Sequence, residues 1–364
     1  MNLRYSMKIH TAVKRFYFLF LLFSFTQNHA QVIEKIYKPY IATAQLYGFG
    51  NQQQLPIYTL NSKEPIQLEF DDLEGSLKSY YYTYVLCDYN WQPANLSTFD
   101  YIKGFTQNRI TNYRYSSYAL TRYTHYEAIL PDANSLPVKS GNYLLKIFLN
   151  GDTSNLVFTK QMLVVDANSV VSAQVVQPLA PQYFKTHQRL DLSVLLPKDM
   201  NAFSAIQQVK AVILQNNRWD NAQGDVVASF QRNNCIFPGG KEWRWLDLRS
   251  FRLQSDRVDS AHYFKKSTDI FLKPDVDRTG QRYVYFPDYD GMYNIISYES
   301  INPHYQGDYA TVNFRYAPPD AKPYFGQSLY LSAAFTEYKP DDRWKLHFND
   351  TTGFYETSAY LKQG

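Results

Sequence analysis

Histidine, the side chain best suited to metal binding and proton transfer near neutral pH, is thinly spread along this chain. The 364 residues include seven histidines. Five of them lie beyond residue 30, and they stand singly, with no H-x-H or H-x-x-x-H pair: His125, His187, His262, His304 and His347. A metal or nucleophile site would have to assemble from separate segments. We expect each of these histidines to be a hydrogen-bonded surface or core residue.

The motifs of common enzymes do not stand out either. We find no usable G-x-S-x-G elbow, S-x-x-K, H-E-x-x-H or P-loop. The two cysteines, Cys87 and Cys235, are too few for an all-cysteine zinc site or a cysteine-ligated iron–sulfur cluster. They either form a disulfide that clamps two domains or, as we favour, lie buried as small apolar residues. The sequence predicts a protein that is not an enzyme and needs no cofactor.

One acidic cluster merits a test for calcium. The segment 275–280 reads D-V-D-R-T-G and begins like a calcium loop, but the twelfth position holds Phe286 instead of a bidentate Glu. The favoured interpretation is therefore two polar hairpin turns around a strand. The alternative is a calcium site, whose oxygen ligands would come from Asp275, Asp277, Asp288 and Asp290.

Aromatic residues are the most unusual part of the composition. The chain has 33 Tyr, 24 Phe and 5 Trp, and such residues favour strands. The segments 80–84 and 113–126 place rings on both faces of their strands. The outer rings either recognise a protein or a sugar, or are buried between domains. The candidates for a partner interface are Tyr113, Tyr115, Tyr118, Tyr123, Trp219 and Trp243. The candidate platforms for sugar stacking are Trp91, Trp219, Trp243 and Trp245.

The elements that must position these residues are strands. Alternation with a period of two is clear in 189–194 and 310–316. Further strands are predicted at 66–70, 80–87, 142–149, 157–165, 209–214, 283–286, 293–298, 329–335 and 344–348, with turn residues between them. Many short strands indicate an all-β protein made of tandem β-sandwich domains of the immunoglobulin or fibronectin type.

The amino-terminal segment predicts export. Residues 1–30 combine basic residues, an apolar run at 16–25 and a small residue at position 30, which is typical of a signal peptide. Its removal takes four basic residues and leaves 33 of the 37 Lys and Arg against 33 Asp and Glu. A formal charge of zero argues against nucleic-acid binding, which needs a basic excess. No later apolar run is long enough to span a membrane.

Changes in composition suggest three domains after the signal peptide. A polar stretch at 166–174 separates a first domain, 31–167, from a second, 168–304. The remaining segment, 305–364, holds about four strands, fewer than the roughly seven of an immunoglobulin-like sandwich. We therefore expect the third domain to be truncated.

Several clusters, taken in order, resemble one family. They are LEFDDL at 68–73, CDYNW at 87–91, YTHYE at 123–127, QNNRWDNA at 215–222 and FPGGKEWR at 237–244. Together they are similar to the type IX secretion system plug protein family of Bacteroidota, and the segment at 215–220 is the sharpest of them.

This resemblance implies a function that composition cannot show. Members of the family are non-catalytic periplasmic proteins that dock on the giant outer-membrane translocon barrel and seal its pore. The implied partner is that barrel, and the implied location is the periplasm. The alternative that we retain is a secreted carbohydrate-binding protein of a surface glycan system, which the tryptophan content suggests.

Overall fold

Two packed sheets form the first part of the structure. It is a computed structural model that describes residues 34–185, 187–197, 208–227, 233–238, 245–278, 289 and 291–364, with the backbone alone for 225–227 and 233–238. The first sheet has the order β1-β12-β11-β5-β7, with β3 beside β12. Its strands are β1 (Lys35–Ile36), β3 (Ile57–Thr59), β5 (Tyr80–Cys87), β7 (Asn108–Arg109), β11 (Gly141–Leu149) and β12 (Leu156–Val165).

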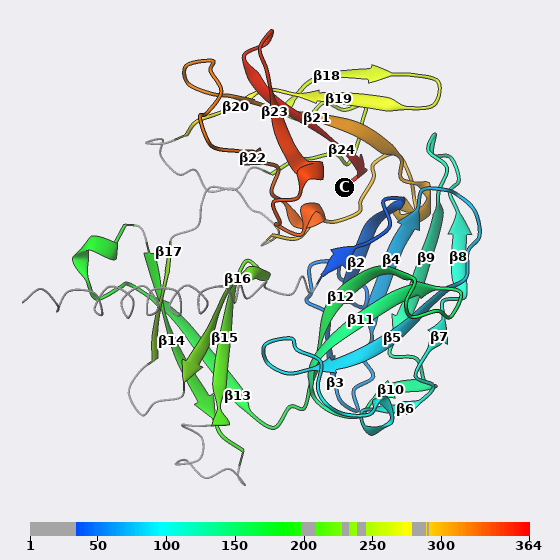
Figure 1. Ribbon diagram of the computed structural model, residues 1–364, viewed down its shortest axis with the longest axis vertical. Coiled ribbons are helices and arrows are strands. Elements are labelled where there is room, and N and C mark those ends of the chain that lie inside the picture. Colours follow the sequence, from blue (N-terminus) through cyan, green and yellow to red (C-terminus); the bar gives the residue numbers. More distant parts are fainter. Residues whose placement is uncertain are drawn as a thin grey trace, which may run out of the picture. The chain divides into compact units, whose positions relative to one another are not determined.

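The second sheet has the order β2-β4-β9-β8 (Figure 1). Its strands are β2 (Ile41–Gly48), β4 (Ile66–Asp72), β8 (Asn112–Tyr115) and β9 (Thr124–Leu130). A short antiparallel pair accompanies the two sheets, formed by β6 (Ile102–Gly104) and β10 (Ser135–Pro137).

Aromatic side chains fill the space between these two sheets. The ring of Phe70 in β4 lies 5.0 Å from those of Tyr80 and Phe158, which belong to the first sheet, in edge-to-face contacts. It also stacks on Tyr126 of β9 at 5.2 Å. Alternate residues of β5 are buried, as a strand with one face on a core requires. The predicted all-β sandwich architecture is confirmed.

The middle segment adds two smaller sheets. One has the order β13-β14-β17, and the other is the antiparallel pair β15-β16. Their strands are β13 (Val170–Val176), β14 (His187–Leu195), β15 (Lys210–Gln215), β16 (Arg218–Val227) and β17 (Asn233–Pro238).

A seven-stranded sheet occupies the last part of the structure. Its order is β18-β19-β21-β24-β23-β22, with β20 beside β21 (Figure 1). Its strands are β18 (Val258–Tyr263), β19 (Thr268–Leu272), β20 (Asp275–Val276), β21 (Tyr309–Ala317), β22 (Leu329–Tyr330), β23 (Lys345–Asn349) and β24 (Phe354–Lys362).

This sheet crosses the predicted boundary between residues 304 and 305. Strands β18 and β19 come before the boundary, and β21 to β24 come after it. The link is a parallel pairing of β19 with β21, in which Asp269 lies opposite Thr311. Parallel partners need a long connection, so local turn signals do not reveal them. The four strands expected after residue 304 thus share a sheet with strands that precede it.

One predicted strand is not a strand. Residues 293–298 join no sheet. Side-chain amides from β2 and the loop after it occupy their backbone groups instead. Gln45 donates to the carbonyl oxygen of Tyr293 at 2.8 Å, and Gln52 accepts from the backbone N–H of Ile295 at 2.7 Å. The backbone N–H of Tyr298 donates to the carbonyl oxygen of Arg249 at 2.9 Å, so both side-chain and backbone groups hold this segment outside any sheet. The strand predicted at 329–335 is likewise shorter, because only β22 is extended. The strand predicted at 283–286 lies outside the described residues.

Helical turns in the described residues are short. They are η1 (Thr98–Asp100), η2 (Pro181–Tyr183), α3 (Pro303–Gln306), η3 (Ala334–Thr336) and η4 (Asp342–Trp344). None of the helices in the described part of the chain has the length and apolar character needed to cross a membrane. Pro303 begins α3, where its fixed φ angle suits a first helical residue, and this turn presents His304 to the second sheet.

Candidate functional site

Strand β4 carries two acidic residues on the face that points away from the aromatic core. Leu68 and Phe70 belong to the core, and because side chains alternate along a strand, Glu69 and Asp71 point to the other side. That side is covered as well, since Glu69 and Asp71 are 3% and 0% exposed. A buried carboxylate needs partners that replace its water.

Asp71 receives three partners from three other strands. One carboxylate oxygen lies 2.7 Å from Nδ1 of His125 in β9. The other lies 2.6 Å from Nζ of Lys362 in β24 and accepts a 2.6 Å hydrogen bond from the hydroxyl of Tyr309 in β21. The buried pair of Asp71 and Lys362 therefore joins the second sheet to the seven-stranded sheet.

Further polar contacts extend this junction. The ammonium of Lys362 also donates to the carbonyl oxygen of His304. It lies 4.2 Å from the ring centroid of Tyr123, which is within cation–π range. The hydroxyl of Tyr123 in turn donates to the carbonyl oxygen of Gly307 at 2.7 Å. The loop that carries α3 is thus held on both sides.

The electrostatics keep Asp71 ionised. Burial raises the pKa of its carboxyl group, but the charge of Lys362 and the hydrogen bond from His125 outweigh burial, and the pKa is lower than usual. Burial raises the pKa of the Tyr309 phenol, and the neighbouring Asp71 raises it further. The ionised Asp71 therefore accepts the hydrogen bonds from Tyr309 and from His125. The proton of the second bond lies on Nδ1 of His125.

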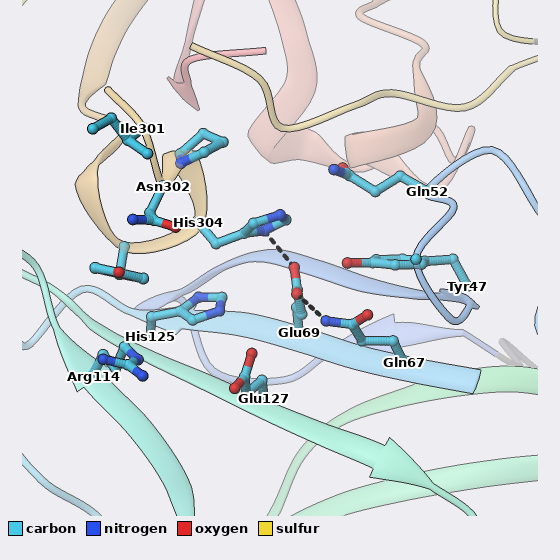
Figure 2. A pocket seen from close by; sticks show the side chains of 13 residues that line it. Tyr47, Gln52, Gln67, Glu69, Arg114, His125, Glu127, Ile301, Asn302 and His304 are labelled. Carbon is cyan, nitrogen blue, oxygen red and sulfur yellow. Dashed lines mark hydrogen bonds and ion pairs between the residues drawn. The ribbon is translucent and has the colours of Figure 1, made fainter. Parts of the chain in front are cut away.

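A polar cavity opens beside this junction. Its volume is about 450 Å³. Glu69, His125 and Glu127 line it from the second sheet, and residues 301–305 line it from the α3 loop (Figure 2). None of its described lining residues is a serine, threonine or cysteine, so the cavity offers its imidazoles no hydroxyl or thiol of these types to activate.

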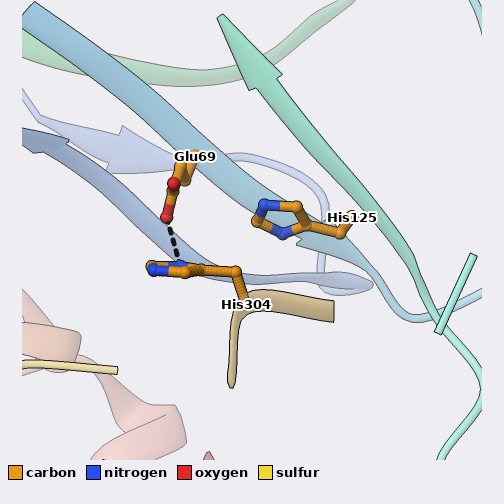
Figure 3. A group of neighbouring side chains, drawn as sticks. All are labelled: Glu69, His125 and His304. Carbon is orange, nitrogen blue, oxygen red and sulfur yellow. Dashed lines mark ion pairs between the residues drawn. The ribbon is translucent and has the colours of Figure 1, made fainter. Parts of the chain in front are cut away.

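Three side chains converge inside the cavity. Oε2 of Glu69 lies 2.5 Å from Nδ1 of His304, and one potential ligand atom from each of Glu69, His125 and His304 lies within 4.8 Å of the other two (Figure 3). Burial raises the pKa of Glu69, but the hydrogen bond and charge of His304, aided by His125, outweigh it and leave the pKa lower than usual. An anionic oxygen between two imidazoles is suited to hold a cation.

Comparison with known proteins identifies the first part of the chain. Residues 41–166 match the family model described as the type 9 secretion system plug protein 1st domain. Over these residues the chain is similar to a type IX plug domain. The predicted resemblance to the plug family is thereby confirmed, and the family points to a role in type IX secretion and to an envelope location. It is also a type of secretion-system component that is not enzymatic.

A solved structure shares the wider architecture. A crystal structure of a hypothetical protein from Parabacteroides merdae ATCC 43184 is 26% identical, with a TM-score of 0.83. The match covers 91% of this chain and 85% of the other. No curated protein matches the chain. The likeness thus extends well beyond the plug domain.

The plug domain contributes only part of the site. Glu69, Asp71 and His125 lie within the matched residues 41–166, whereas His304 and Lys362 lie outside them. The buried junction and the cavity therefore connect the plug domain to the seven-stranded sheet and the α3 loop.

The structure divides the predicted interface residues. Tyr113, Tyr115 and Tyr118 are 38%, 54% and 93% exposed. The first two lie on β8, an edge strand of the second sheet. Tyr123 is a correction, because it is 1% exposed and packs beneath the α3 loop. Trp219 is half-buried, and Trp243 lies outside the described residues.

Two of the candidate tryptophans in the described residues, Trp91 and Trp219, are not coplanar. Trp91 is buried, and its ring meets that of Trp219 at 4.8 Å and 87°, which is an edge-to-face pair. Trp245 is partly exposed. The pair of Trp91 and Trp219 is therefore not a flat platform for a sugar ring.

The remaining candidate residues are partly described. Asp275 pairs with Arg257 at 2.8 Å, which gives its carboxylate a structural partner. Asp277 is exposed, and Asp288 and Asp290 lie outside the described residues. Cys87 is a free, buried thiol whose pKa burial raises. The favoured interpretation of Cys87 as a buried residue agrees with this state.

The cluster of Glu69, His125 and His304 was missed in the sequence. Each histidine stands alone, and the two lie on segments 179 positions apart that only the fold brings together. A signal was nevertheless present. Glu69 and Asp71 share one face of β4, opposite Leu68 and Phe70, and the strand at 124–130 holds a histidine as its second residue.

Residues 215–220, the most specific of the family-like segments, form a hairpin turn and a ring contact with the plug domain. Gln215 pairs with Arg218, so Asn216 and Asn217 are the two residues of a hairpin loop, and both have a φ of 55°. This is the geometry of a type I′ turn, which asparagine tolerates. Trp219 follows and meets Trp91 of the plug domain. The segment thus has a structural role in holding the middle hairpin.

We expect Trp219→Ala to destabilise the protein by about 3–5 kcal/mol at most, because the ring is half-buried and loses its aromatic partner. Urea unfolding followed by fluorescence measures this change. Phe325→Ala is the matched control, since Phe325 is fully exposed and its removal should change stability by less than about 0.5 kcal/mol. Equal losses of stability from the two substitutions would contradict a stabilising contact between Trp219 and Trp91.

Proposed function

We propose that this protein is a non-catalytic plug subunit that docks on the outer-membrane translocon of the type IX secretion system and seals its pore from the periplasm. The observation that carries the proposal is the match of residues 41–166 to the plug protein 1st domain. The neutral charge of the chain after residue 30 and the absence of an enzyme motif agree with a protein that acts by contact.

The junction around Asp71 supports a sealing role. A plug must resist deformation, and a domain joined to its neighbour by a flexible linker would not. Here a buried ion pair, 2.6 Å between Asp71 and Lys362, and the 2.6 Å bond from Tyr309 fix the plug domain to the seven-stranded sheet. Buried polar networks of this kind fix one arrangement of the parts that they join.

Strand β8 is the docking surface that the geometry favours. It is the edge of its sheet, and all four of its residues are exposed. Tyr113 and Tyr115 project from it, and Tyr118 follows. An edge strand offers unpaired backbone groups, and exposed tyrosines supply contact area at low entropic cost. A stable contact with the barrel would need a total interface of about 1,600 Å².

The test is a pull-down of the translocon barrel from native envelopes. We expect the full-length protein to copurify with the barrel, and Tyr115→Ala with Tyr118→Ala together to reduce the yield of the complex by about tenfold or more, as loss of interface aromatics does. Phe99→Ala removes a ring that is 78% exposed on η1 and is the matched control.

Two results would count against parts of the proposal. Persistent absence of the barrel from pull-downs of the unaltered protein would overturn the plug function. Normal recovery with the tyrosine variant would move the docking surface away from β8 and leave the plug function standing. We also expect cells that lack this protein to admit large solutes through the outer membrane. An uptake assay measures this leak.

A further inference from the structure

The polar cavity between the second sheet and the α3 loop holds residues that could bind a metal ion. The proposed role in secretion does not require a metal. We propose that Glu69, His125 and His304 bind a zinc ion that ties the α3 loop to the second sheet. This inference stands on the geometry of the cavity and does not rest on the proposed function.

The first argument is convergence. One potential ligand atom from each of the three residues lies within 4.8 Å of the others. Ligands at the usual zinc distances, in a tetrahedron, are about 3.3 Å apart. Zinc binding would require side-chain rotations that bring the furthest ligand atoms closer together and open the 2.5 Å contact between Glu69 and His304 to admit the ion.

The second argument is the state of His125. Its Nδ1 is held at 2.7 Å by Asp71, which leaves Nε2 with a lone pair. The residue is 4% exposed, and Nε2 has no hydrogen-bond partner among the described residues. Figure 3 shows a ring nitrogen of His125 directed towards Glu69. A buried acceptor without a donor is costly, and a cation would satisfy it.

The contact with Asp71 is the arrangement that metal-binding histidines usually have. A carboxylate on the far ring nitrogen fixes the tautomer and orientation of the ring and makes the free nitrogen a better ligand. Asp71 is itself held by Lys362 and Tyr309. The buried junction therefore holds the carboxylate that orients His125. A cluster of residues on the surface would lack such support.

The donor set selects the metal. Two imidazoles and one carboxylate suit zinc and other late first-row ions, whereas calcium and magnesium prefer oxygen ligands alone. Three protein ligands leave a fourth position open to the cavity for a water molecule. Arg114 lies on the cavity wall and Glu127 opposes its charge there, so the wall as a whole does not repel a cation.

The three ligands come from β4, β9 and α3, so a bound ion would close a long loop of chain. Zinc would then raise the melting temperature, because a ligand that binds the folded state alone stabilises it by mass action. The test uses the tag-free protein after removal of metals with EDTA, titrated with zinc chloride by calorimetry. We expect one zinc ion per chain, a higher melting temperature, and a visible absorption spectrum of tetrahedral cobalt when Co²⁺ replaces zinc.

The decisive variant is His304→Ala. Its side chain is 29% exposed and lies on a loop, so the fold should survive, which circular dichroism checks. Loss of a direct ligand should weaken zinc binding by about 100-fold or more, since loss of an outer partner alone weakens it by ~10–100-fold. His304→Gln is the second variant, with the same expected loss. His347→Ala removes an exposed histidine of β23 and should bind zinc normally.

Two outcomes would overturn the proposal. The first is a folded, metal-free protein that binds no zinc in the calorimetric titration. The second is zinc that binds His304→Ala and His304→Gln as tightly as it binds the unaltered protein, because the ion would then lie elsewhere. Both outcomes leave the pull-down of the translocon unaffected, so failure of the zinc site and failure of the plug function are distinguishable.

Discussion

Asp71→Asn is expected to lower the free energy of unfolding by about 3–5 kcal/mol, because it leaves the buried ammonium of Lys362 without its counter-charge. The lysine side chain is 1% exposed, so water cannot replace the lost carboxylate. Tyr309 and His125 lose a charged acceptor at the same time. Urea unfolding followed by tryptophan fluorescence measures the loss.

A double-mutant cycle isolates the pair. Lys362→Met keeps the length and apolar stem of the side chain, and Asp71→Asn with Lys362→Met removes both charges. We expect the double variant to be more stable than the sum of the single losses predicts, by about 1–3 kcal/mol. Hydrogen exchange should show the α3 loop and β24 loosened in the single variants.

The control for this cycle is an exposed ion pair. Asp341 accepts two hydrogen bonds at 3.0 Å from the side chain of Arg343 on η4, where both residues are in contact with solvent. Asp341→Asn should cost about 1 kcal/mol or less, as for other surface pairs. If Asp71→Asn cost no more than Asp341→Asn, the junction would not hold the two parts together.

Phe70→Ala is expected to lower the free energy of unfolding by about 3–5 kcal/mol, as much as Asp71→Asn. Phe70 is fully buried, and its ring touches three others, on Tyr80, Tyr126 and Phe158. Removing it leaves a cavity where the two sheets of the plug domain meet, and neighbouring rings cannot collapse into it without losing their own contacts.

Phe70→Leu is the companion substitution. It keeps an apolar side chain of similar reach, so the loss should be clearly smaller than that of Phe70→Ala. Thermal unfolding followed by circular dichroism ranks the variants. A Phe70→Ala protein that melts with the unaltered protein would show that the aromatic core contributes little to the stability of the plug domain.

Two strands of the plug domain were readable in the sequence because they are short runs rich in aromatic and β-branched residues, which favour strands. The prediction of a strand at 80–87 coincides with β5, and that at 157–165 differs from β12 by one residue. Strand β5 buries alternate residues, whereas β12 buries residues on both faces. The plug-family resemblance rested on other segments, at 68–73, 87–91, 123–127, 215–222 and 237–244.

The candidate site could not be read in this way. Tyr123 looked like a surface ring because its burial comes from the α3 loop, 184 positions later in the chain. The same holds for His125 and His304, which meet only after the sheets have packed. The strand predicted at 293–298 failed for a related reason, since Gln45 and Gln52 supply bonds that a neighbouring strand would otherwise give.

The junction around Asp71 has a consequence for how the chain matures. Synthesis proceeds from the amino terminus, and early domains generally begin to fold first. The strand with Glu69 and Asp71 therefore emerges nearly 300 positions before Lys362, which completes its outer face. Until then a nascent first domain exposes two acids on a surface meant to be covered. We expect proteases to recognise incomplete chains by this uncovered acidic surface and to remove them.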